Sequence, residues 1–280
     1  MTHSAQPTLT ASPPTCVICI DPPTDPLLQA QAQSLAKQLA LPITPTSDVV
    51  EVQLVLTPKR LELCWQTPSQ SPRRGRPILA NWLGIDTTSP QGRRLRQPIA
   101  RAVGIRKGDP YRPTIIDATA GFGEDAWLFA SLGCHVTMIE RQPIIAALLT
   151  DTLHRVATSK PQLANRISLI VGDAQEILPT LSPAEVVYLD PMFPPRRSSG
   201  LENKRMRLLR RLAGHDPDAS DLFHLACQTA TRRVVVKRPL HADTIDTTPP
   251  AATHKGKSLR YDVYSTRLGQ HGADANESQP

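Results

Sequence analysis

The sequence predicts an α/β protein with a mostly parallel sheet and a small α/β domain at its N-terminus. From Thr114 onward, short runs of β-branched and aliphatic residues alternate with segments of helical periodicity. Such alternation is typical of βαβ units, which place helices on both faces of a parallel sheet. Several predicted strands end in a carboxylate or a glycine-rich turn. Open parallel sheets bind their ligands at that edge, so we expect a site there.

Hydrophobic patterning gives the elements of the large domain, which we place at residues 92–268. We expect strands at 114–118, 135–139, 166–171, 185–189, 233–237 and 259–265, and helices at 124–132, 142–157 and 218–229. A helix with one basic face is expected over 92–107, because apolar residues interleave with arginines there. The polar tail 269–280 is expected to be disordered.

The N-terminal part divides into a disordered segment, residues 1–15, and a small α/β domain with its linker, residues 16–91. A strand from Cys16 precedes a helix capped by Thr24 or Asp25. The alternating segment 49–56 and the segment 61–65 then form a hairpin. The linker is rich in Pro, Ser and Arg.

Composition bounds the class of protein and its partner. The net charge of +7 and a pI near 9.4 favour a polyanionic partner, because basic side chains release counterions from phosphates. No apolar run approaches a membrane span and the N-terminus resembles no signal peptide, so we expect a cytoplasmic protein without membrane contact. Cys16 and Cys19 form a CxxC, but no second pair accompanies it, so we interpret them as strand residues and expect no metal.

The strongest local motif closes the first strand of the large domain with the residues DATAGFGED, 117–125. Gly121 and Gly123 let the backbone approach a ligand closely. Asp117 could hold the cationic amino-acid end of S-adenosylmethionine, which carries an ammonium and a sulfonium. The same residues also satisfy the dinucleotide pattern G-x-G-x-x-[GA], so this loop alone leaves a nicotinamide or flavin enzyme equally open.

Two further strand ends carry carboxylates. Glu140, 19 residues after Gly121, can accept hydrogen bonds from ribose hydroxyls in either cofactor class. Asp173 follows the next strand and could accept a hydrogen bond from the adenine amine, or it could cap a short helix.

The loop Asp190-Pro191-Met192-Phe193 favours methyl transfer to an amino group. Amino-group methyltransferases typically carry [DNS]-P-P-[YFW] at this strand end. A nucleobase amine is a poor nucleophile because its lone pair is delocalised, so an acceptor such as Asp190 and an aromatic face such as Phe193 assist the reaction. Met192 replaces the usual second proline. A dehydrogenase has no need of this arrangement.

These residues together resemble a known family, ribosomal RNA small subunit methyltransferase J. The resemblance lies in DATAGFGEDAWLFASLGCHVTMIERQPIIAALL, VVYLDPMFPPRRSS and RRVVVKRP, and upstream in LVLTPKRLEL and GRRLRQPIARAVGI. It runs from about Val49 to about Tyr264. It implies a class I, Rossmann-like methyltransferase that uses S-adenosylmethionine to methylate the N2 amine of one guanosine in 16S rRNA.

The family's cofactor contacts, carried over by position, fall on Glu124, Asp125, Glu140, Arg141, Asp173, Ala174 and Asp190. Glu124 stands where the family often has arginine, and Asp173-Ala174 stand where a relative has two serines. We expect catalysis to depend on Asp190 and Phe193, the latter as platform for an extruded base.

Cations gather after the Asp190 loop and at the end of the 233–237 strand, where they are expected to contact RNA phosphates. These are Arg196, Arg197, Lys204, Arg207, Arg211, Lys237 and Arg238. The alternatives are an amino-methyltransferase acting on DNA, tRNA or a protein glutamine, an NAD(P)-dependent oxidoreductase, and a non-catalytic RNA-binding module. The sequence leaves the oligomeric state open.

Overall fold

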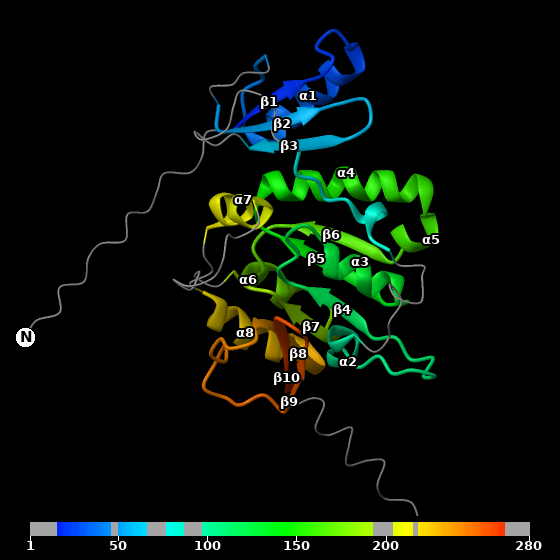
Figure 1. Cartoon of the computed structure of the whole chain (residues 1–280), viewed down its shortest axis with the longest axis vertical. Coiled ribbons are helices and arrows are strands. Elements are labelled where there is room, and N and C mark those ends of the chain that lie inside the picture. The colour runs from blue at the N-terminus through cyan, green and yellow to red at the C-terminus, as the bar shows by residue number, and fades with distance from the viewer. Residues whose placement is uncertain are drawn as a thin grey trace, which may run out of the picture.

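The chain forms a large α/β body that carries a small three-stranded sheet at one end (Figure 1). The computed structural model describes residues 16–45, 50–65, 77–86, 97–192, 204–214 and 218–266. The large sheet has seven strands in the order β6-β5-β4-β7-β8-β10-β9, and the small sheet has the order β1-β2-β3. The segments 1–15 and 269–280, expected to be disordered, lie outside the described residues.

The large sheet is parallel except at one edge. Its strands are β4 (Thr114–Asp117), β5 (His135–Glu140), β6 (Ile167–Val171), β7 (Ala184–Leu189), β8 (Ala230–Pro239), β9 (Ala252–Lys255) and β10 (Leu259–Ser265). Strands β4 to β8 pair in parallel, whereas β10 runs antiparallel between β8 and β9. The six predicted strands are confirmed to within a few residues, and β9 was not predicted.

Helices cover both faces of this sheet. They are α2 (Pro98–Ala102), α3 (Glu124–Ser131), α4 (Pro143–Ser159), α5 (Pro161–Ala164), α6 (Ala174–Ile177), α7 (Lys204–Ala213) and α8 (Ala219–Thr229), with short 3-10 helices η1 (Trp82–Gly84) and η2 (Leu178–Thr180). Val235 of β8 belongs to one buried cluster, and its neighbours Val234 and Val236 belong to another. Successive side chains of a strand point to opposite faces, so both faces of β8 require apolar residues.

The small domain follows the predicted order of strand, helix and hairpin. It contains β1 (Cys16–Ile20), α1 (Pro26–Leu39), β2 (Val52–Leu56) and β3 (Leu61–Trp65). Strand β1 pairs in parallel with β2, and β2 and β3 form the hairpin. Asp25 caps α1 by accepting hydrogen bonds from the amides of Leu27 and Leu28.

Cys16 and Cys19 are buried in β1, as predicted. In the part of the chain that the structure describes, no three His, Cys, Asp or Glu side chains are grouped so that they could hold a metal ion. None of the described helices is long and apolar enough to cross a membrane.

Part of the expected linker belongs to the core. Trp82 is fully buried and stacks on Trp127 of α3, with ring centroids 5.6 Å apart. Its indole N–H donates to the carbonyl of Phe122, 2.8 Å away. Ile78 pairs with Leu63 of β3 in an isolated bridge. This segment therefore joins the small domain to the 117–125 loop.

The long basic helix expected over 92–107 is wrong in its described part. Helix α2 spans only Pro98–Ala102, and Ile99, Ala100 and Ala102 are buried. Gly104 then takes a φ of 95°, which ends the helical path.

Candidate active site

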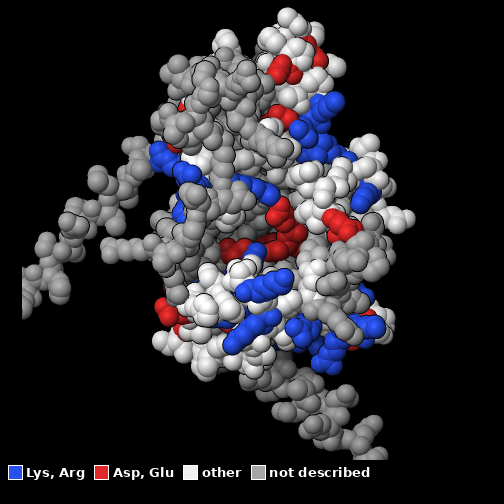
Figure 2. All heavy atoms as spheres, in the orientation of Figure 1, with Lys and Arg blue, Asp and Glu red and all other residues white. Residues whose placement is uncertain are grey.

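A cavity of about 780 Å³ lies where the strand order reverses. From β4 the chain proceeds to β5 and β6 on one side, whereas β7 and β8 lie on the other side. The loops after β4 and β7 therefore diverge and leave a crevice at the carboxyl edge of the sheet. Figure 2 shows a hollow with acidic side chains at its centre and basic side chains around it. Its volume suits a small organic ligand.

The glycine loop after β4 forms one wall of the cavity. Gly121 lines it with a φ of 54°, and its amide donates to Oε2 of Glu140 at 2.8 Å. Gly123 has a φ of 69°, and a Cβ there would lie 2.5 Å from the Trp82 ring. Gly123 is not among the residues that line the cavity. Its contact with the cofactor stays a prediction, and the close approach of Trp82 is a second reason for glycine at this position.

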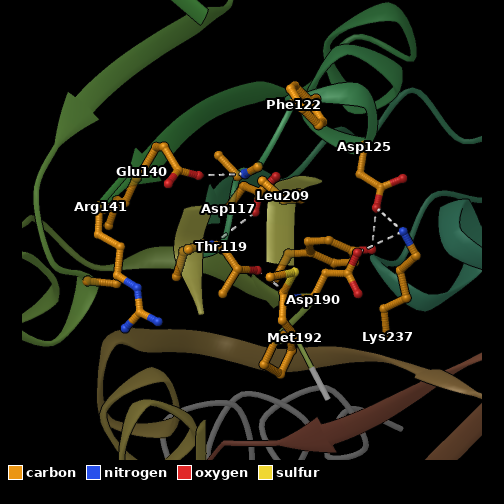
Figure 3. A pocket seen from close by; sticks show the side chains of 18 of the residues that line it. Asp117, Thr119, Phe122, Asp125, Glu140, Arg141, Asp190, Met192, Leu209 and Lys237 are labelled. Carbon is orange, nitrogen blue, oxygen red and sulfur yellow. Dashed lines mark hydrogen bonds and ion pairs between the residues drawn. The ribbon is translucent and has the colours of Figure 1, made fainter. Parts of the chain in front are cut away.

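Glu140 and Arg141 lie at one end of the cavity, away from Lys237 (Figure 3). Glu140 is 7% exposed, and its carboxylate accepts the amides of Gly121 and Gln142 at 2.8 and 2.7 Å. A carboxylate accepts up to about four hydrogen bonds, so these two amides are compatible with further donors such as ribose hydroxyls. They also fix the carboxylate against the glycine loop.

Asp173 and Ala174 border the same end of the cavity. Asp173 is the N-cap of α6, and its carboxylate accepts the amide of Gln175 at 2.8 Å. The guanidinium of Arg141 lies 3.9 Å from the carboxylate of Asp173 and 3.4 Å from that of Asp218. The interpretation of Asp173 as a helix cap is confirmed. Its contact with adenine stays a prediction.

At the other end, one ammonium group bridges two carboxylates (Figure 3). Nζ of Lys237 lies 2.8 Å from Asp125 and 2.9 Å from Asp190. The hydroxyl of Tyr188 donates to the same oxygen of Asp125 at 2.7 Å. Burial by itself would lower the pKa of Lys237, but the charges of Asp190 and Asp125 raise it above its usual value. Lys237 is therefore held as a cation.

Asp117 lies in the floor between these ends and is 2% exposed. Burial, followed by the charge of Asp125, raises the pKa of Asp117 well above the usual range. Its carboxylate accepts the amide of Thr119 at 3.2 Å. The hydroxyl of Thr119 in turn accepts the amide of Asp190 at 2.6 Å. This pair of contacts ties the loop after β4 to the loop after β7.

Helix α7 closes a further side of the cavity. Leu209 lines it and lies 3.6 Å from where a Cβ on Gly121 would stand. Arg205 pairs with Glu124 and places its guanidinium 4.2 Å from the ring centre of Phe122. Glu124, where the family often has arginine, thus holds a cation supplied by α7.

The same helix also contacts the small domain. The guanidinium of Arg207 lies 5.2 Å from the ring centre of Trp65, and Nε of Arg211 lies 3.4 Å from Glu51. Both were predicted to bind RNA, and that role stays a prediction. The side chain of Lys204 and the residues Phe193, Arg196 and Arg197 lie outside the described residues.

The binding of RNA phosphates by Lys237 and Arg238 stays a prediction. Lys237 faces two carboxylates inside the cavity, and Arg238 is 5% exposed and donates to the carbonyl of Asp243. Both residues line the cavity between β4 and β7.

The remaining predicted site residues line one cavity, although they come from four strand ends. These are Asp117, Gly121, Glu124, Asp125, Glu140, Arg141, Asp173, Ala174 and Asp190. Sequence reasoning missed Thr119, Tyr188 and Trp82. Tyr188 offered a signal, because a tyrosine inside an otherwise aliphatic strand needs a partner for its hydroxyl.

Comparisons with known proteins agree with this geometry. Residues 34–266 match a family model described as "Putative SAM-dependent methyltransferase". A Ribosomal RNA small subunit methyltransferase J from Thioalkalivibrio sulfidiphilus is 41% identical over 246 residues, covering 85% of this chain and 94% of the relative. One of the same name from Coxiella burnetii is 42% identical over 243 residues, covering 85% and 93%.

A solved structure also resembles the whole chain. The crystal structure of a SAM-dependent methyltransferase from Neisseria gonorrhoeae is 32% identical and superposes with a TM-score of 0.63. The match covers 94% of this chain and 99% of that one. The similarity therefore includes the small domain as well as the seven-stranded sheet.

Proposed function

Because the chain belongs to the ribosomal RNA small subunit methyltransferase J family of S-adenosylmethionine-dependent enzymes, we propose that it methylates the N2 amine of a guanosine in 16S rRNA. The fold is the predicted class I, Rossmann-like one. The observation that carries the proposal is the Asp190 carboxylate, which pairs with Lys237 and lines an acidic cavity.

The cavity fits S-adenosylmethionine by its size and its charge. Seven carboxyl groups and five basic groups line about 780 Å³, an excess that favours a cationic ligand. Glu140 would hold the ribose, Asp173 and Ala174 the adenine, and Asp117 with Gly121 the amino-acid end. When bound, S-adenosylmethionine supplies an electrophilic methyl group on a sulfonium.

Asp190 would receive the guanine amine. Its carboxylate is 39% exposed, so an incoming base can reach it, while Lys237 at 2.9 Å orients it. Asp190 accepts a hydrogen bond from the amine, which aligns the nitrogen, and it takes the proton that the nitrogen loses. Such acid–base assistance is typically worth about 10²–10⁴-fold, and alignment of the reacting atoms supplies the rest.

The base would be extruded from the RNA onto Phe193, and Met192 lines the cavity directly before it. Arg196, Arg197, Lys204, Arg207 and Arg211 would hold the neighbouring phosphates, which position the RNA without reading its sequence. Because α7 carries three of these cations and also lines the cavity, RNA and cofactor would share one helix.

A methyl-transfer assay tests the proposal. Purified protein and tritiated S-adenosylmethionine are incubated with small ribosomal subunits from a strain lacking this activity, with tRNA, with duplex DNA and with a glutamine-containing protein fraction. We expect label only in 16S rRNA, recovered as N2-methylguanosine after digestion. Label in tRNA, DNA or protein instead would move the chain to another substrate class.

A further inference from the structure

A second cavity, of about 400 Å³, lies apart from the first and is rich in arginine. Arginines and a histidine line it together with one tyrosine, namely Arg101, Arg106, Arg232, Arg233, His254 and Tyr111. None of them lines the cavity between β4 and β7. They come from α2 and the turn after it, the segment before β4, the start of β8, and β9. Segments distant in sequence thus bring four guanidinium groups together.

Positive charge predominates in this second cavity. Asp109 lines it, and Glu185 lies 3.8 Å from Arg232 while it accepts the hydroxyl of Tyr111 at 2.6 Å. Two carboxylates thus face four arginines. Within the described part of the chain, Arg101 and Arg106 have no carboxylate at ion-pair distance. Uncompensated cations around a hollow favour an anion there.

The cations also act on one another. Burial, followed by the charge of Arg232, lowers the pKa of Arg233. Burial, followed by the charges of Arg101 and Arg233, lowers the pKa of His254. A bound anion would relieve this repulsion.

Two of the guanidinium groups are already held in place. Arg232 lies 4.8 Å from the ring centre of Tyr111, and Arg233 donates to the carbonyl of Ala102 at 3.3 Å. Gly104 packs beside Arg233, whose guanidinium carbon lies 3.5 Å from the place where a Cβ on Gly104 would stand. Groups fixed in advance lose little conformational entropy when they bind an oxyanion, and arginine suits the two-point recognition of phosphate.

Strand β8 connects the two cavities. Arg233 stands near its start and Lys237 near its end, and the alternation of side chains puts both on the same face. Four residues of strand span about 13 Å, a distance that an RNA strand covers within a few nucleotides. Helix α2 packs against β9 and β10 beside this path (Figure 1).

We propose that the second cavity binds a backbone phosphate of the same RNA whose guanosine enters the catalytic cavity. The inference rests on the proposed function and adds a contact at the opposite end of β8. It predicts that the RNA extends from the carboxyl edge of the sheet toward its amino edge, across α2.

A pair of charge-removing variants tests the site. Arg101→Gln with Arg106→Gln removes two exposed cations from the cavity and retains polar side chains. Lys37→Gln with Lys59→Gln removes two exposed cations from the small domain and serves as the matched control. Binding of radiolabelled 16S rRNA is measured by filter retention over a salt series, and binding of S-adenosylhomocysteine by calorimetry.

We expect the cavity variant to bind 16S rRNA about tenfold more weakly, as the loss of a charge-assisted contact implies. The slope of its log affinity against log salt concentration should become less steep by about one. The control variant should match the wild type, and S-adenosylhomocysteine should bind both alike. An affinity and slope equal to those of the control would overturn the proposal.

Binding of inorganic phosphate distinguishes a site for RNA from a site for a free anion. If the variant loses calorimetric binding of inorganic phosphate but retains wild-type affinity for 16S rRNA, the cavity serves a free anion and the proposal is wrong. If the wild type and the cavity variant bind and methylate 16S rRNA equally well, the second cavity does not bind the RNA, and the proposed function is unaffected. If the wild type itself does not methylate 16S rRNA, the proposed function is wrong.

Discussion

Replacing Lys237 by methionine should destabilise the protein measurably, because the change leaves Asp125 and Asp190 without their shared cation. The two N–O distances of 2.8 and 2.9 Å correspond to gross attractions of about 6 kcal/mol each at an effective dielectric of 20. Desolvation of the ammonium and repulsion between the carboxylates offset most of this. Removing one partner of a buried pair costs about 3–5 kcal/mol.

Partial exposure reduces that figure. The side chains of Lys237, Asp125 and Asp190 are 19%, 24% and 39% exposed, so water screens part of the interaction. We therefore expect Lys237→Met to lower the free energy of unfolding by about 2–4 kcal/mol. Urea denaturation at neutral pH, followed by circular dichroism and tryptophan fluorescence, measures the change.

A double-mutant cycle assigns the effect to the bridge. Asp125→Asn removes one of the two carboxylates, so Lys237→Met should cost less in that background, with a coupling of about 1–3 kcal/mol. Lys255→Met removes an exposed lysine of β9 and should change stability by less than about 0.5 kcal/mol. A loss below about 1 kcal/mol for Lys237→Met, or strict additivity in the cycle, would mean that the bridge contributes little to stability.

Three further predictions follow from the same cavity. Asp190→Ala should reduce methyl transfer by at least about 10²-fold with a smaller loss of S-adenosylhomocysteine binding by calorimetry, and wild-type turnover would contradict its role. Trp82→Ala should cost about 3–5 kcal/mol of stability in urea and weaken cofactor binding, because the ring supports the glycine loop through Phe122; unchanged cofactor affinity would contradict that link. Because burial raises the pKa of Asp117, wild-type stability should fall relative to Asp117→Asn as pH rises above the ordinary carboxyl range, and a pH-independent difference would contradict it.

The central strands of the large sheet could be predicted because they are buried on both faces. Continuous runs such as Arg233–Lys237 and Glu185–Leu189 leave little choice of structure when helices flank them. Strand β9 could not be predicted in this way. Its four residues, ATHK, are exposed or half-buried at the edge of the sheet, and they form a strand only because β10 pairs with them.

The predicted site residues were placed mainly by the rule that parallel strands end at one edge. The contacts of Lys237 and Gly123 could not be predicted, because their partners are distant in sequence. Lys237 contacts Asp125, which is 112 residues away in the sequence. Gly123 packs against Trp82, which belongs to a segment that the sequence did not assign to the core. The charge of Lys237 and its place at the sheet edge predicted a phosphate contact, and the structure shows that its side chain lies in the cavity.

Mapping of the modified nucleoside tests whether this chain methylates a guanine amine of 16S rRNA with Asp190 as acceptor. Mass spectrometry of 16S rRNA is compared between a deletion strain and the same strain expressing the wild type or Asp190→Ala. We expect N2-methylguanosine at one position, absent in the deletion strain, restored by the wild type and not by Asp190→Ala. Identical modification in all three strains would contradict it.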